Sequence, residues 1–372
     1  MTHVITQANR QRLVLNHQDH KYEFTALWLR ERSPDDATRD PYTGQRLIEA
    51  AEIPLDLAIE RAEASDEELT LNFSDGHSTT FTLATLFDKQ TSDSPRQLWD
   101  AAQAPISEAN FATALEDDSA LLDMLDALHR NGFVIVSGVP ADSDGMQPLI
   151  DRIGPLRRTN WGGIADVKSV ASAYDLTMTQ RGLEPHTDNP YRDPIPGYIW
   201  LHCLANAAEG GDSTLADGFM AARLLRQRDP SAYACLTQIT PSFRYCDADT
   251  FLESEGPLIE LDSRGEPVRV RYSNRTEYIP ALLAKELEAY YAARKAFYEL
   301  ITGEELTLHL KLDPGQMLII DNYRLLHGRS AFQLAGGVRH MRQGYVDRDS
   351  TTSRRRVLQQ RLTNPQSQGE PA

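Results

Sequence analysis

The sequence has few cysteines, and their spacing excludes several classes of protein. Among 372 residues there are only three, Cys203, Cys235 and Cys246, and no two have the C-x-x-C spacing of zinc or redox motifs. A small secreted domain stapled by disulfides would need more. We therefore expect three free thiols that behave as small apolar side chains in a reducing compartment.

Basic residues are also in short supply. Lysine and arginine number 38 against 54 acidic residues, which gives a net charge of -16. Such a chain offers no large basic surface to a phosphate backbone, so we expect no nucleic-acid partner. No apolar run approaches a membrane span, and the opening MTHVITQANRQRL lacks a basic-then-apolar export signal. We expect a cytoplasmic protein with no membrane partner.

What is present predicts a mainly β protein with some helix. Residues 1–95 are polar and carry short strand-like runs, which predicts a small β-rich domain. Residues 96–118 have the composition of a linker. From 119 to 365 many short strands alternate with turns and a few helices, a pattern typical of a jelly roll with a pocket between its two sheets. Residues 366–372 are expected to be a tail.

Two motifs far apart in the chain carry metal-binding residue types. In His186-Thr187-Asp188 an imidazole and a carboxylate are two residues apart, so both point to one side of an extended segment. His327 follows much later, in DNYRLLHGR. Two imidazoles and one carboxylate form the facial triad that binds Fe(II) and leaves its other positions open. A single histidine is more often an ordinary interior residue, and it is the combination that predicts iron.

Long segments around these motifs resemble the γ-butyrobetaine dioxygenases, within the taurine-dioxygenase-like superfamily of Fe(II)/2-oxoglutarate enzymes. The segments are HTDNPYRDPIPGYIWLHCLANAAEGGDSTLADGF, and DNYRLLHGRSAF followed by RHMRQGYVDRD. With 257–272 and the start of the chain, the resemblance spans most of the sequence. It implies a double-stranded β-helix, a homodimer, and hydroxylation of a small zwitterion with Fe(II), 2-oxoglutarate and O2.

The resemblance also implies roles for individual residues. His186, Asp188 and His327 would ligate the iron and form the catalytic centre. Arg339, twelve residues after His327, would pair with the far carboxylate of 2-oxoglutarate through its planar guanidinium, beside the hydroxyl of Thr214. A binding module that keeps the pocket without turnover is the alternative from another class, although a binder has no need of an open iron face.

In this family an aromatic cage holds a trimethylammonium group, because ring faces attract a cation that cannot donate hydrogen bonds. Trp161 and Tyr345 stand at cage positions, while other cage positions are changed. Tyr191 is a candidate to compensate, whereas Tyr174 is better explained by core packing.

The acid end of the substrate site distinguishes two substrates. Asn274 matches an asparagine near the substrate carboxylate of the family, and the next residue is Arg275. An added guanidinium suits an anion with more charge and oxygen atoms than a carboxylate, although Arg275 could equally be a solvated loop residue. We therefore favour conversion of 2-(trimethylammonio)ethylphosphonate to its 1-hydroxy product, at the carbon beta to nitrogen. The alternative is γ-butyrobetaine, which would give L-carnitine.

The N-terminal stretch resembles the N-terminal domain of the same family, in Trp28-Leu29-Arg30 and residues 43–46. Relatives often place zinc-binding cysteines between these motifs. Residues 31–40 contain none, so a zinc site is not expected there. Tight turns and charge pairs are expected to stabilise the segment instead.

Overall fold

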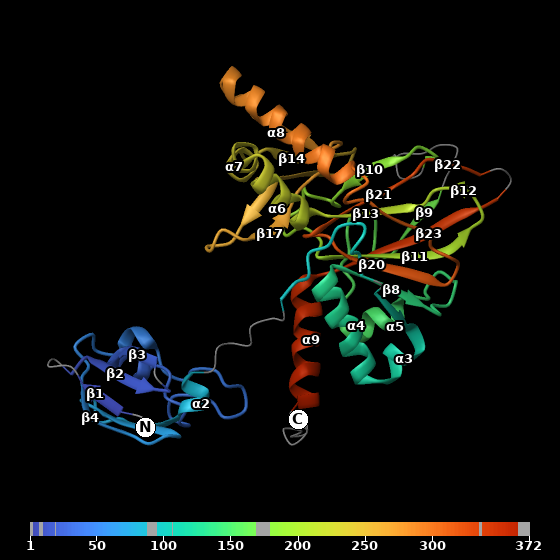
Figure 1. The fold of residues 1–372 in the computed structure, drawn as a ribbon. Coiled ribbons are helices and arrows are strands. Elements are labelled where there is room, and N and C mark those ends of the chain that lie inside the picture. The colour runs from blue at the N-terminus through green and yellow to red at the C-terminus, as the bar shows by residue number, and fades with distance from the viewer. Residues whose placement is uncertain are drawn as a thin grey trace. The chain divides into compact units, whose positions relative to one another are not determined.

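The computed structural model describes residues 3–6, 10–18, 20–87, 95–105, 107–168, 179–334 and 337–363. The chain forms two compact units, Met1–Asp93 and Ser94–Ala372 (Figure 1). None of the described helices combines the length and the apolar character that a membrane span requires.

The N-terminal unit contains two three-stranded antiparallel sheets, with strand orders β1-β2-β3 and β4-β5-β6. Apolar residues alternate along β5, so Leu69, Leu71 and Phe73 point to one side and are almost fully buried in a shared core. The elements are β1 His3–Thr6, β2 Arg12–His17, β3 His20–Thr25, α1 Ala26–Arg30, η1 Ala50–Glu52, β4 Ile59–Ala64, β5 Glu68–Phe73, β6 Ser78–Thr82 and α2 Leu83–Leu86.

Polar contacts hold the cysteine-free segment 31–40. A carboxylate oxygen of Asp35 lies 2.9 Å from His77 Nε2, and Asp35 also accepts a hydrogen bond from the Thr38 backbone N–H at 3.1 Å. Arg30 donates to Asp75 at 2.8 Å. Burial alone would raise the pKa of Asp35, but the charge and hydrogen bond of His77 outweigh burial and lower that pKa. Turns and charge pairs therefore stabilise this loop.

The second unit is built on two facing sheets that form the predicted double-stranded β-helix. One has the order β7-β8-β20-β11-β23-β9 and the other β10-β21-β13-β19. Ile199, Leu215, Leu318 and Leu325 belong to one buried apolar cluster of strand residues. The strands are β7 Glu108–Asn110, β8 Phe133–Ser137, β9 Ala165–Lys168, β10 Leu183–His186, β11 Tyr198–Asn206, β13 Ser213–Asp217, β19 Leu308–Leu310, β20 Gln316–Asp321, β21 Leu325–Arg329 and β23 Arg339–Val346, with a small pair β12 Glu209–Gly210 and β22 Phe332–Gln333.

Helices cover the outer face of the six-stranded sheet (Figure 1). α4 begins after Asp117, whose carboxylate accepts hydrogen bonds from the N–H groups of Ser119 and Ala120, and it ends at Gly132 with φ 84°. Its buried apolar residues recur at helical spacing, at Leu121, Met124, Leu125 and Leu128. The helices are α3 Phe111–Glu116, α4 Asp118–Asn131, α5 Gln147–Ile153 and α9 Arg348–Thr363.

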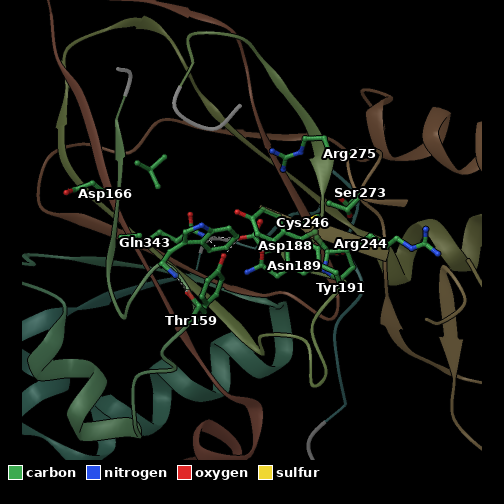
Figure 2. Close-up of a pocket in the computed structure, with 18 of the residues that line it drawn as sticks. Thr159, Asp166, Asp188, Asn189, Tyr191, Arg244, Cys246, Ser273, Arg275 and Gln343 are labelled. Atoms are coloured by element: carbon green, nitrogen blue, oxygen red, sulfur yellow. Dashed lines mark hydrogen bonds between the residues drawn. The ribbon is translucent and has the colours of Figure 1, made fainter. Parts of the chain in front are cut away.

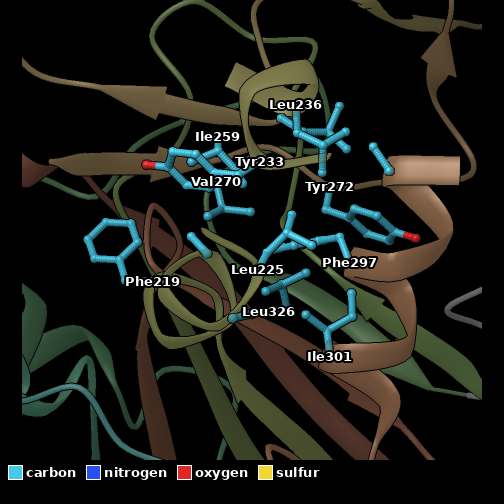
Figure 3. Close-up of a cluster of buried hydrophobic side chains, with 14 of the residues drawn as sticks. Phe219, Leu225, Tyr233, Leu236, Ile259, Val270, Tyr272, Phe297, Ile301 and Leu326 are labelled. Carbon is cyan, nitrogen blue, oxygen red and sulfur yellow. The ribbon is translucent and has the colours of Figure 1, made fainter. Parts of the chain in front are cut away.

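A long insertion between β13 and β19 has its own apolar core (Figure 3). Phe219, Leu236 and Phe297, from three different helices, are almost fully buried there. The insertion contributes residues of two of its strands and of the turn between 273 and 276 to the lining of a cavity. Its elements are α6 Gly218–Arg228, α7 Pro230–Gln238, β14 Ser242–Cys246, β15 Phe251–Glu255, β16 Ile259–Leu261, β17 Pro267–Val270, β18 Glu277–Tyr278 and α8 Ala284–Thr302.

Residues 96–118, for which composition predicts a linker, instead belong to the second unit. They contain β7 and α3, and Trp99 is fully buried, with its indole N–H donating to Asn131 O at 2.7 Å. Composition misjudges this stretch because a polar segment needs only a few apolar anchors to be tied to a core.

Candidate metal centre and adjoining cavity

Strand register brings the two halves of the candidate triad together. β10 pairs antiparallel with β21 so that His186 lies opposite His327, and their rings are 4.4 Å apart between centroids. Asp188 follows two residues later, with Oδ1 3.4 Å from His186 Nε2 and 3.7 Å from His327 Nε2. One ligand atom from each residue lies within 4.8 Å of the others, the one such group among the described residues. A single ion can therefore contact all three.

Both imidazoles have surroundings that favour metal binding. His186 Nδ1 is 2.9 Å from Glu184 O, so donation to this carbonyl leaves Nε2 with its lone pair for a metal. Burial, with added repulsion from His186 and Arg275, lowers the pKa of His327 to about 4. A neutral imidazole is the form that binds a metal. The donor set of two imidazoles and one carboxylate thus fits Fe(II).

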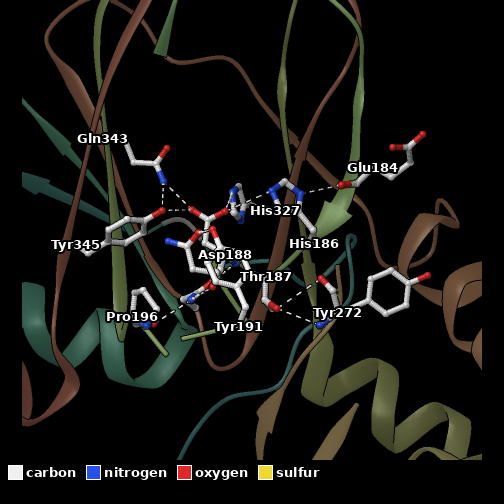
Figure 4. Close-up of polar contacts among 12 residues, drawn as sticks. Glu184, His186, Thr187, Asp188, Tyr191, Pro196, Tyr272, His327, Gln343 and Tyr345 are labelled. Carbon is white, nitrogen blue, oxygen red and sulfur yellow. Dashed lines mark hydrogen bonds and ion pairs between the residues drawn. The ribbon is translucent and has the colours of Figure 1, made fainter. Parts of the chain in front are cut away.

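The two oxygens of Asp188 have different surroundings (Figure 4). Oδ1 faces the histidines, whereas Oδ2 accepts hydrogen bonds from Gln343 Nε2 at 2.6 Å and from the Tyr345 hydroxyl at 2.8 Å. Burial by itself would raise the pKa of Asp188, but His327 and His186 together bring it well below its usual range. Burial and the Asp188 charge raise the pKa of Tyr345, so this phenol stays protonated and donates.

The backbone that carries the triad is also fixed. Thr187 N donates to Tyr272 O at 2.8 Å, and Tyr272 N donates back to Thr187 Oγ1 at 3.0 Å. Asn189 adopts a left-handed conformation with φ 51°, which asparagine tolerates better than most residues. Its Oδ1 accepts from the Tyr191 hydroxyl at 2.6 Å. The turn after Asp188 is thereby linked to a cavity-lining tyrosine.

Arg339 has the properties of a carboxylate receptor. It starts β23, and strand alternation places it on the same face as Gln343 and Tyr345. Its side chain is buried, its Nε has no hydrogen-bond partner, and no ion pair involves it within the described part of the chain. A side chain at Gly211 would approach Arg339 Nε to 3.2 Å, so glycine leaves room for the guanidinium. A buried cation without a counter-charge fits the acid end of 2-oxoglutarate.

Thr214 does not share a face with the triad. Thr214 lies opposite Gly328 in the β13–β21 pairing, while Leu215 lies opposite His327. Directly paired residues point to the same side of a sheet, so the Thr214 hydroxyl lies on the side away from His327. Ser213, one residue earlier and buried, is on the His327 side. Sequence could not choose between adjacent hydroxyls because only the strand register decides which face each occupies.

A cavity of about 1000 Å³ adjoins the triad through Asp188 (Figure 2). Trp161, Tyr191 and Tyr345 all line it, as the sequence predicts for cage residues. Tyr245 joins them, edge-on to Trp161 with centroids 5.3 Å apart and stacked on Tyr191 at 5.3 Å. Tyr174, for which the sequence favours core packing, lies outside the described residues.

Of the two acid-end candidates, only Arg275 lines the large cavity. Arg275 lines the same cavity as the aromatic rings, together with Ser273 and Arg244. Asn274 does not line it. Asn274 is exposed, accepts from Arg294 Nη2 at 3.1 Å and lines a smaller neighbouring cavity of about 220 Å³. Both residues lie in a turn in which Thr276 N and Glu277 N donate to Ser273 O, and Arg275 borders the smaller cavity as well as the large one.

Sequence reasoning missed Tyr245, Ser213 and Gln343. Nothing local distinguishes Tyr245, because a distant insertion carries it to the cavity. Gln343 carries a signal in its spacing, since it lies two residues before Tyr345, and in a strand such as β23 residues at this spacing share a face.

Comparisons with known protein families and proteins agree with this site. The profile described as "Taurine catabolism dioxygenase TauD, TfdA family" matches residues 92–345. A second profile, "Gamma-butyrobetaine hydroxylase-like, N-terminal", matches residues 4–87.

Among curated proteins, a gamma-butyrobetaine dioxygenase of Pseudomonas sp. (strain AK-1) is 32% identical over 348 residues, covering 90% of each chain. The human gamma-butyrobetaine dioxygenase is 28% identical, covering 94% of this chain and 95% of that protein. A mitochondrial trimethyllysine dioxygenase of Gallus gallus is 28% identical, covering 95% and 87%. A solved taurine dioxygenase from Burkholderia xenovorans superposes with a TM-score of 0.51 at 18% identity, covering 65% and 88%, which supports the fold.

Proposed function

The chain belongs to the TauD, TfdA dioxygenase family, and from this premise we propose that it hydroxylates a small quaternary-ammonium acid. It is an Fe(II)/2-oxoglutarate-dependent dioxygenase. When bound, iron, 2-oxoglutarate and O2 supply an oxidant for an unactivated C–H bond, and succinate and CO2 are released. The preferred substrate is 2-(trimethylammonio)ethylphosphonate, converted to its 1-hydroxy product.

The observation that carries this proposal is the group of four aromatic rings in the cavity beside Asp188. Trp161, Tyr191, Tyr245 and Tyr345 all line this cavity, and Tyr245 lies 5.3 Å from both Trp161 and Tyr191 between ring centroids. Ring faces bind a trimethylammonium group because it carries charge but no N–H. Since Tyr345 also donates to Asp188, a cation on this ring would present its neighbouring carbons to the metal side of the cavity.

The anionic end of the substrate would meet Arg275 on the same cavity. We propose Arg275 as the group that favours a phosphonate, because a guanidinium can form several charge-assisted hydrogen bonds to a tetrahedral anion. Asn274 would contribute only if its loop rotated, since it now contacts Arg294.

For the co-substrate, we propose that Arg339 binds the far carboxylate of 2-oxoglutarate and that Ser213, rather than Thr214, supplies the accompanying hydroxyl. Arg339 is buried without a carboxylate partner in the described regions, and Ser213 shares the face of His327.

γ-Butyrobetaine is the second candidate substrate, favoured by the 32% identity to a gamma-butyrobetaine dioxygenase. Succinate formation with Fe(II) and 2-oxoglutarate should be measured with each zwitterion and without either. A higher kcat/KM for the phosphonate supports the first proposal, and a higher value for γ-butyrobetaine replaces it with the second. No succinate above the substrate-free level, despite bound iron, would favour a binding module. The predicted homodimer and cytoplasmic location can be tested by light scattering and cell fractionation.

A further inference from the structure

We propose that Gln343 is a positioning residue for the metal ligand Asp188, acting with Tyr345 to hold the carboxylate oxygen that faces away from the metal. Gln343 Nε2 donates to Asp188 Oδ2 at 2.6 Å and to the Tyr345 hydroxyl at 2.7 Å. The Tyr345 hydroxyl completes the ring by donating to the same Oδ2 at 2.8 Å. Figure 4 shows the Gln343 amide and the Tyr345 hydroxyl meeting at the Asp188 carboxylate.

The direction of these hydrogen bonds follows from chemistry. An ionised carboxylate can only accept, so both neighbours must donate to it. The phenol has one hydrogen, which goes to Asp188, and its oxygen can then accept from Gln343. The primary amide has two N–H groups, one for each partner. Glutamine is therefore matched to this position by its number of donors, and a glutamate here would add a second negative charge.

Gln343 is itself held rigidly. It lies in the middle of β23, paired with Leu201 on β11 and with Ala165 on β9. Asp188 follows β10, which belongs to the other sheet. The hydrogen bond from Gln343 therefore crosses between the two sheets and ties Asp188 to the larger, six-stranded one. Supporting groups fixed in this way hold a ligand in one orientation.

The arrangement leaves one oxygen for the metal. Oδ1 lies 3.4 Å and 3.7 Å from the two ligating nitrogens, while Oδ2 is occupied by two donors. A carboxylate free to rotate could offer a metal both oxygens and so occupy an additional position. By holding Oδ2, Gln343 and Tyr345 limit Asp188 to one oxygen and keep the remaining positions for 2-oxoglutarate and O2.

The test measures metal binding without substrate, using Co(II) as the probe in anaerobic titrations of the full chain. Gln343→Met keeps the side-chain length but removes both donors, and Tyr345→Phe removes the other donor. Gln359→Leu is the matched control. Gln359 Nε2 donates a similar hydrogen bond to Asp126 Oδ1 at 3.2 Å, and neither residue belongs to the metal site. We expect the Kd for Co(II) to rise roughly 10- to 100-fold in Gln343→Met, with a shifted visible absorption band. The control should change Kd by less than about twofold, which is the scatter expected for a change outside the coordination environment.

An unchanged Kd and an unchanged Co(II) spectrum in Gln343→Met would overturn the proposal. If Gln343→Met does not fold, Tyr345→Phe decides in its place, because it removes one hydroxyl and keeps the ring. Melting temperatures of the metal-free proteins separate a local effect from general destabilisation. Because no substrate is present, the result is independent of the substrate proposed above.

Discussion

The side-chain amide of Asn322 forms hydrogen bonds with both backbone groups of Asp188. Its Oδ1 accepts from Asp188 N at 2.7 Å, and its Nδ2 donates to Asp188 O at 3.0 Å. The same Nδ2 donates to Pro196 O at 2.9 Å, and the side chain is fully buried. Asn322 immediately follows β20 and precedes the strand that carries His327. One amide thus links the two halves of the metal site through the backbone.

Asn322→Ala should destabilise the fold and weaken metal binding together. It removes the side-chain partner of one buried and two partly buried backbone groups, so we expect the free energy of unfolding to fall by about 2 to 3 kcal/mol. Urea denaturation followed by circular dichroism measures this change. Asn72→Ala, which removes an exposed hydrogen bond to Ser78, is the control and should cost less. Equal losses of unfolding free energy in the two variants would contradict this role of Asn322.

Asp188→Ala should abolish iron binding and turnover, because only two of the three ligands remain. Wild-type protein with iron and 2-oxoglutarate under anaerobic conditions should show metal-to-ligand charge-transfer absorption, and this variant should not. Asp262→Ala, in an exposed hairpin turn, serves as control. Normal succinate formation by Asp188→Ala would remove the iron assignment.

Arg275→Ala should alter substrate preference more than overall activity. Loss of a charge-assisted contact to the phosphonate should raise its KM roughly 10- to 100-fold, with a smaller effect on γ-butyrobetaine. Arg228→Ala removes a guanidinium that pairs on the surface with Glu305 and should change neither KM. Parallel losses for both substrates would argue against Arg275 as the phosphonate contact.

Arg324→Met should strongly destabilise the second unit. Arg324 and Asp217 form an ion pair at 2.7 Å in which both side chains are fully buried. Removing one partner leaves a buried charge uncompensated, which typically costs about 3 to 5 kcal/mol. The exposed pair of Arg228 offers a contrast, since its loss should cost less than about 1 kcal/mol. Chemical denaturation of both variants gives the comparison, and similar costs would be inconsistent with burial as the cause.

Acid should remove the contribution of Asp35 to the N-terminal unit. Its pKa is lowered in the folded chain relative to the ordinary value of 3.8. Such a carboxyl stabilises the fold at a pH above that ordinary value, and this contribution disappears as the pH falls through the folded-state pKa. Asp35→Asn should therefore lower the melting temperature at pH 7 and lower it by less near pH 3, by calorimetry. The exposed neighbour substitution Asp36→Asn should show no such difference. A constant difference at both pH values would contradict the prediction.

Sequence alone was sufficient for the reaction class and the jelly roll, and it named three candidate metal ligands that the structure brings together. His186, Asp188 and His327 are chemically distinctive, and their motifs lie in long, specific segments, so little structural information is needed to pair them. The cage candidates Trp161, Tyr191 and Tyr345 were also accessible, because each lies near a recognisable motif.

The tertiary structure decided which neighbours reach the site. Register between β13 and β21 turns Thr214 away and Ser213 inward, and the turn after Ser273 places Arg275 but not Asn274 against the large cavity. The insertion delivers Tyr245, and the facing sheets bring Gln343 to Asp188. These outcomes depend on pairing across long sequence separations, and shifting a strand by one residue moves every side chain to the opposite face. Local composition does not determine that register, because the register is set only when strands distant in sequence pair and the two sheets pack against each other.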